Sequence, residues 1–97
     1  MADKDEILID EVEAAFRSAY RRFRRADPGE QDSMFNDLQR AATEWVRAQK
    51  KLVEDDELAT QAMLDQMRRI KDEIDDAANT QELVIALGRL VAFLVAL

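Results

Sequence analysis

Apolar side chains recur every three or four residues along most of the chain, which is the spacing of one face of an α-helix. Strand-like alternation never extends beyond a few residues. Glycine and proline, the residues that most disfavour a helix interior, occur only twice and once. The pattern therefore predicts an all-α protein: a single domain built as an antiparallel bundle of three or four helices, at residues 3–26, 28–53, 56–78 and 80–97.

The first three predicted helices are amphipathic, and their apolar stripes define the expected core. Each also carries acids near its start and basic residues near its end, which stabilises it through the helix dipole by about 0.3–1 kcal/mol per charge. The stripes are Ile9, Val12, Phe16, Ala19, Phe23 and Ala26 in the first helix, Met34, Leu38, Ala41, Trp45, Ala48 and Leu52 in the second, and Met63, Met67, Ile70, Ile74 and Ala77 in the third.

Capping sequences mark the helix borders. Asp27, Pro28 and Glu30 predict a capping box at the start of the second helix, and the alternative is a start a few residues later with Asp32 or Ser33 as the cap. Asn79 with Glu82 predicts another capping box at the start of the fourth. The second stripe loses its phase near residues 54–57. We therefore expect a break there, with Asp55 or Asp56 as the cap of the third helix. A single long, bent helix is the alternative, because no glycine or proline enforces the break.

Residues 82–97 differ from the rest, because thirteen of these sixteen residues are apolar. A helix that is apolar on all sides must be covered on all sides, either by the chain's other helices or by a second copy. Small residues at every fourth position would allow another helix to approach closely. We therefore predict a homo-oligomer, a dimer or tetramer. Its self-association residues are Leu87, Gly88, Leu90, Val91, Ala92, Phe93, Leu94 and Ala96.

Membrane attachment, as a peripheral or tail-anchored protein, is a further interpretation of the same segment. A spanning helix needs about 20 apolar residues. Residues 83–97 are too short for this and include the charged Arg89. Insertion would be marginal, so burial in protein is favoured.

Arginine is concentrated in the stretch RSAYRRFRR, residues 17–25. Arg17, Arg21, Arg24 and Arg25 share an arc of about 100° that points away from the apolar stripe. They form a candidate site for an anion or for an acidic partner. The alternative, favoured by the net charge of −7, is that they pair with the chain's own acids at residues 72–76.

Two acidic pairs, Glu54 with Glu57 and Glu73 with Asp76, have the spacings Glu-x-x-Glu and Glu-x-x-Asp. Together with the stretch KKLVEDDELA they resemble the motifs of the all-α nucleoside triphosphate pyrophosphohydrolases. The resemblance implies four carboxylates on adjacent helices that hold Mg²⁺ against a triphosphate. Oxygen ligands suit this ion, which can activate water. A Mg²⁺-dependent enzyme is therefore the alternative function, and Mg²⁺ its cofactor.

Composition narrows the remaining classes. The chain has no histidine and no cysteine, which removes the commonest general base, thiolate metal sites and disulfides. The net charge of −7 argues against duplex nucleic acid as a partner. The acidic opening MADKDEILID is not typical of a targeting peptide, so the expected location is the cytoplasm. The favoured function is a cofactor-free, non-catalytic adaptor, chaperone or regulator that binds copies of itself or a protein client through helix–helix contacts.

Overall fold

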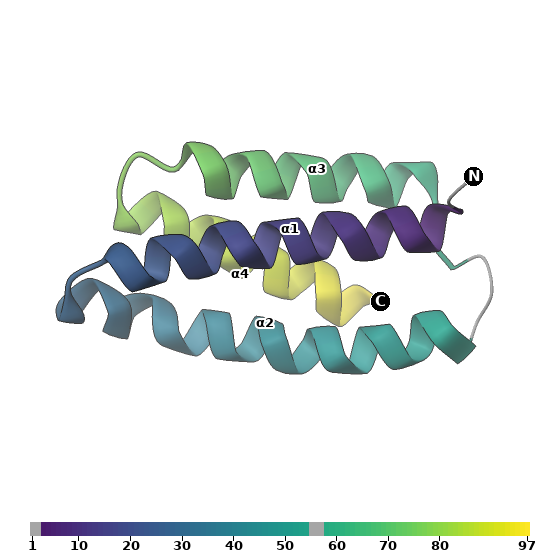
Figure 1. Ribbon diagram of the computed structural model, residues 1–97, viewed down its shortest axis with the longest axis horizontal. Helices are drawn as coiled ribbons and strands as arrows, with labels where there is room; N and C mark the ends of the chain where they lie inside the picture. Colours follow the sequence, from purple (N-terminus) through teal and green to yellow (C-terminus); the bar gives the residue numbers. More distant parts are fainter. Residues whose placement is uncertain (1–2, 55–57) are drawn as a thin grey trace.

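The computed structural model describes residues 3–54 and 58–97. They form four helices: α1 (Lys4–Arg25), α2 (Pro28–Glu54), α3 (Gln61–Asp76) and α4 (Thr80–Ala96). The helices pack side by side as a bundle that measures 41 × 22 × 19 Å (Figure 1). The all-α bundle predicted from the apolar periodicity is therefore confirmed, with four helices.

Side-chain caps explain where α2 and α4 begin. The Asp27 carboxylate accepts a hydrogen bond from the amide of Glu30, and the Glu30 carboxylate accepts one from the amide of Asp27. This reciprocal pair is the expected capping box. At the start of α4, the Asn79 side chain accepts a hydrogen bond from the amide of Glu82, which confirms the predicted cap.

The second and third predicted helices are separate, not one bent helix. α2 ends at Glu54, and α3 begins only at Gln61, several residues later than predicted. The capping roles expected of Asp55 and Asp56 lie outside the described residues. Thr60 is the cap that the structure shows.

The late start of α3 has a local cause. Ala59 is buried, and its amide donates a hydrogen bond to the Asp5 carboxylate of α1 at 2.7 Å. The Thr60 hydroxyl then accepts a hydrogen bond from the amide of Met63, which starts the helix. Docking of this segment against α1 therefore sets the border.

Helices that follow one another in the chain run in opposite directions, but the closest packing is between parallel helices (Figure 1). α1 packs mainly against α3, and α2 mainly against α4. α3 also packs against α4, whereas α1 and α2 share the least extensive of the four main interfaces. The side of the bundle formed by α1 and α2 is thus the least closed.

The core contains all six side chains predicted for α2, but the buried side of α1 and of α3 is shifted. α1 turns its small and aliphatic residues inward and its aromatic residues toward α2, so the aromatic positions are only partly buried. The buried residues that the stripes omitted are Leu8, Ala15 and Leu64, and the predicted residues that are only partly buried are Ile9, Phe16, Phe23, Ala26 and Met63.

Two arginines bind the ends of the parallel neighbours. Arg22 of α1 donates to three carbonyl oxygens at the end of α3, with N–O distances from 2.6 to 3.3 Å. Arg47 of α2 donates to two at the end of α4, at 2.7 and 3.3 Å. The last carbonyls of a helix lack partners within it and carry the negative end of its dipole. Because the neighbours are parallel, an arginine late in one helix reaches the end of the other.

We expect Arg22→Leu to lower the free energy of unfolding by about 1–3 kcal/mol, because three carbonyl oxygens lose a charged donor. Urea denaturation followed by circular dichroism measures the change. Arg21→Leu is the control. Arg21 is exposed and has no carboxylate within 4 Å among the described residues, so its loss should cost less than about 0.5 kcal/mol. Equal losses in the two variants would contradict the capping role.

Candidate functional site

An apolar groove of about 190 Å³ lies between α1 and α2. Tyr20 and Phe35 stand at the groove and are 55% and 52% exposed, which is unusual for large apolar side chains. The ring centroids of Tyr20 and Phe23 are 6.2 Å apart and the rings are tilted, so the two pack against each other. The groove is lined by Phe16, Tyr20 and Phe23 of α1 and by Phe35, Leu38, Gln39 and Ala42 of α2.

A second apolar stripe extends the groove along α2. Phe35, Ala42, Val46 and Val53 lie within an arc of about 40°, and the two valines are 68% and 79% exposed. The stripe runs from position 35 to position 53, about 27 Å of helix. We use the name α1–α2 face for the groove residues together with Val46 and Val53. The sequence analysis did not predict this face. The spacing of Phe35, Ala42, Val46 and Val53, which places them on one side of a helix, could have indicated it.

The arginines predicted as a partner site are exposed, and the structure describes no carboxylate within 4 Å of them. Pairing of Arg17, Arg21, Arg24 and Arg25 with the acids of residues 72–76 is therefore not seen at ion-pair distance. The arginine that binds the end of α3 is Arg22, which the prediction left out. Arg17 and Arg24 lie three residues before and four after Tyr20, so they flank the groove.

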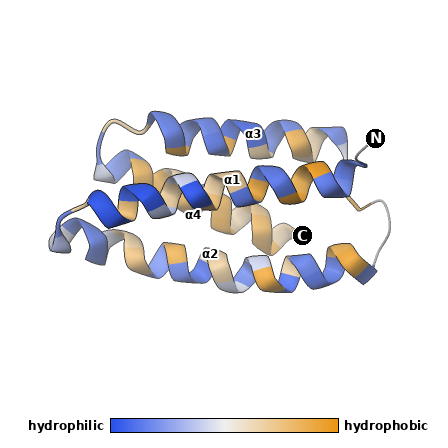
Figure 2. Cartoon of the chain, in the orientation of Figure 1, coloured by the Kyte–Doolittle hydropathy of each residue, from blue (hydrophilic) through white to orange (hydrophobic). Residues whose placement is uncertain are grey.

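α4 is a core helix of the chain itself, and Figure 2 shows it coloured mainly as hydrophobic. Side chains buried in this core cannot also form a surface for a second copy. This burial removes five of the eight predicted self-association residues and leaves Ala92 and Ala96 exposed and Gly88 partly exposed. The five are Leu87, Leu90, Val91, Phe93 and Leu94.

The two acidic pairs lie far apart along the fold. Glu54 closes α2, and Glu57 lies outside the described residues. Glu73 and Asp76 follow the start of α3 by 12 residues or more, about 18 Å of helix. Glu73 forms an ion pair with Arg89 at 2.6 Å. Within residues 3–54 and 58–97, no group of three or more acidic side chains is arranged to hold a metal ion.

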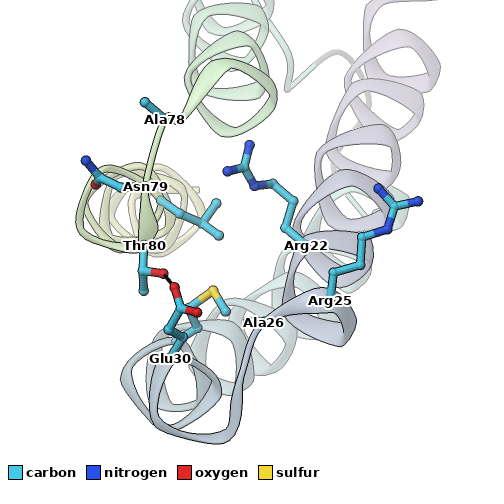
Figure 3. A pocket seen from close by; sticks show the side chains of 9 residues that line it. Arg22, Arg25, Ala26, Glu30, Ala78, Asn79 and Thr80 are labelled. Atoms are coloured by element: carbon cyan, nitrogen blue, oxygen red, sulfur yellow. Dashed lines mark hydrogen bonds between the residues drawn. The ribbon is translucent and has the colours of Figure 1, made fainter.

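A pocket of about 400 Å³ lies at the end of the bundle where α2 and α4 begin (Figure 3). Arg22, Glu30, Asn79 and Thr80 are among its polar residues. The Thr80 hydroxyl donates to the Glu30 carboxylate, while Arg22 and Asn79 bind the helix ends already described. These four groups are hydrogen-bonded within the chain, so this part of the pocket reflects the packing of helix ends; the exposed Arg25 also lines the pocket.

Asp75 ties α3 to α1. Its carboxylate accepts hydrogen bonds from the Ser18 hydroxyl and from the Lys71 ammonium, the latter at 2.8 Å. Partial burial raises the pKa of Asp75, but these two donors and the positive charges of Lys71 and Arg21 outweigh it, so the pKa lies below 3.8. The hydrogen bond and the charge of Asp75 raise the pKa of Lys71 above 10.5. The tie therefore stabilises the fold between these values and weakens when Asp75 gains a proton or Lys71 loses one.

Comparison of the chain with models of protein families, with curated proteins and with solved structures found no match. The resemblance to the pyrophosphohydrolases therefore still rests on the two short acidic motifs alone. In the part of the chain that the structure describes, no helix is both long and apolar enough to cross a membrane. The geometry of the α1–α2 face is consequently the main indication of function in the described residues.

The open surroundings of Gly88 give a test of how α4 is placed. A Cβ atom added at Gly88 would meet no atom within 4 Å. Gly88→Ala should therefore raise the free energy of unfolding by about 0.5–1 kcal/mol, since alanine favours a helix interior over glycine. Urea denaturation at low protein concentration measures the change. A loss of stability would mean that this side of α4 is covered.

Proposed function

We propose that the protein is a non-catalytic helical interaction module that docks a partner helix on the α1–α2 face. The observation that carries the proposal is the apolar groove between α1 and α2, with Tyr20 and Phe35 exposed beside it. Burial of apolar surface is worth about 25 cal/mol per Å². Docking of a helix would therefore gain free energy at a place where the chain alone leaves aromatic side chains in water.

The shape of the face suits a helix. Its stripe on α2 is straight and about 27 Å long, or five helical turns. Recognition of a helix in a groove uses anchors three, four and seven residues apart, and Phe35, Ala42 and Val46 repeat at such intervals on the receiving side. Arg17 and Arg24 beside Tyr20 would form ion pairs with acidic side chains of the partner at the edge of the interface.

Catalysis has less support in the described residues. The chain holds no histidine, and the acidic residues that the structure describes form no metal-binding group. Four of the polar residues that line the pocket where α2 and α4 begin are already hydrogen-bonded. The activities that remain for this surface, those of an adaptor, chaperone or regulator, all require docking of another protein segment.

Site-specific photo-crosslinking tests the docking face. A photo-reactive phenylalanine analogue at position 35 or 46 should give discrete cross-linked products in cells, because both positions would lie under the docked helix. The matched control is position 66, where Gln66 is exposed on α3. Absence of discrete products at positions 35 and 46, or equal products at position 66, would contradict the proposal. So would release of pyrophosphate from a nucleoside triphosphate with Mg²⁺ that Glu57→Gln abolishes.

A further inference from the structure

We infer that the partner of the α1–α2 face is the same face of a second copy of this chain. A two-fold axis would relate the copies so that α1 meets α1 and α2 meets α2 in antiparallel orientation. The inference rests on the proposed function, because it names the partner of the same face. In such a dimer the same surface is used by both copies. Two residues then lie opposite each other when their numbers add up to a constant, so the sequence order on each helix can be tested for self-complementarity.

The charges along α1 satisfy this condition. Glu6 and Arg24 add up to 30, and so do Glu13 and Arg17. All four are exposed and lie within an arc of about 40° beside Tyr20. No ion pair within 4 Å involves them in residues 3–54 and 58–97. An antiparallel second copy would therefore place each acid opposite an arginine, on both sides of the axis.

The exposed residues of α2 satisfy the same condition. Phe35 and Val46 add up to 81, so a second copy would pack the aromatic ring of one against the valine of the other. Asp32 and Lys50 add up to 82, one more than the apolar pair, and would place opposite charges near each other at the edge. Lys50 also reaches Glu54 at 3.9 Å, but this pair is mostly accessible to water and weak.

One axis serves both helices. The midpoint of the α1 pairs is residue 15, and those of the two α2 pairs are 40.5 and 41. Phe16 of α1 and Leu38, Gln39 and Ala42 of α2 line the same groove, so residues close to both midpoints lie around it. The charge pairs of α1 and the pairs of α2 therefore require nearly the same placement of the second copy. The two helices give this result independently of each other.

The face is large enough for a stable dimer. The bundle measures 41 × 22 × 19 Å, so its long sides have areas of about 800 to 900 Å². Specific interfaces bury about 800 Å² on each partner. The docking of a second copy would use most of one side of the bundle and would leave α4 in the core of each copy.

Charge reversal at Glu6 and Arg24 tests the inference, because the two residues are about 27 Å apart on one helix and cannot pair within a copy. Sedimentation equilibrium should show a dimer for the unchanged chain. Glu6→Arg and Arg24→Glu should each raise the dimer dissociation constant about tenfold or more, since each places like charges together twice. An equimolar mixture of the two variants should restore dimers, because every pair is then opposite in charge.

Asp72→Arg and Arg69→Glu on α3 change the net charge equally and should leave the dimer intact. Gly88→Leu on α4 should also leave it intact, because position 88 lies outside the α1–α2 face and a Cβ atom there meets no atom within 4 Å. Circular dichroism confirms that each variant is folded. A chain that stays monomeric, a dimer that ignores both reversals, or a dimer lost in Gly88→Leu would each overturn the inference. If the chain is monomeric but position 35 forms discrete cross-links to another protein, the proposed function stands and only the inference fails. If the chain is monomeric and no such cross-links form, the proposed function and the inference both fail.

Discussion

The need to cover α4 sets the arrangement of the whole bundle. Seven side chains of this helix are buried, and they draw α2 and α3 against it. α2 can turn only one side toward α4, and it uses the stripe from Met34 to Leu52. Its second stripe, from Phe35 to Val53, therefore faces the side where α1 packs least. The exposed α1–α2 face is thus a consequence of how the apolar C-terminal helix is buried.

The same arrangement decides how the helix ends are satisfied. Helices packed in parallel bring their negative ends together, which is unfavourable unless a cation or donor lies there. Arg22 and Arg47 supply both. Among the described residues no polar or charged side chain is buried, so the core is purely apolar and the polar contacts lie at its edges. Polar groups that could bind a partner therefore lie on the surface of the bundle, and the exposed arginines of α1 are among them.

Sequence periodicity was sufficient for the helices, because an apolar stripe and a cap are local features. It predicted every core residue of α2 and the caps Asp27 and Asn79. It could not fix the rotation of α1, since Leu8 and Ile9 are equally apolar and only packing against α3 chooses between them. It also could not decide whether α4 is buried in the chain or between copies. The α1–α2 face was missed for a related reason: it combines residues of two helices whose contact depends on tertiary structure.

The distance between two copies tests the central claim most directly. Since the chain has no cysteine, Ala42→Cys carries a single spin label close to the inferred axis. Dipolar electron spin resonance should give one short inter-copy distance for this label. The same label at position 53 should give a distance longer by about 30 Å, since the two sites lie 11 residues apart on each copy. No dipolar signal at either position, or a short distance only from a label at position 92 on α4, would contradict the account.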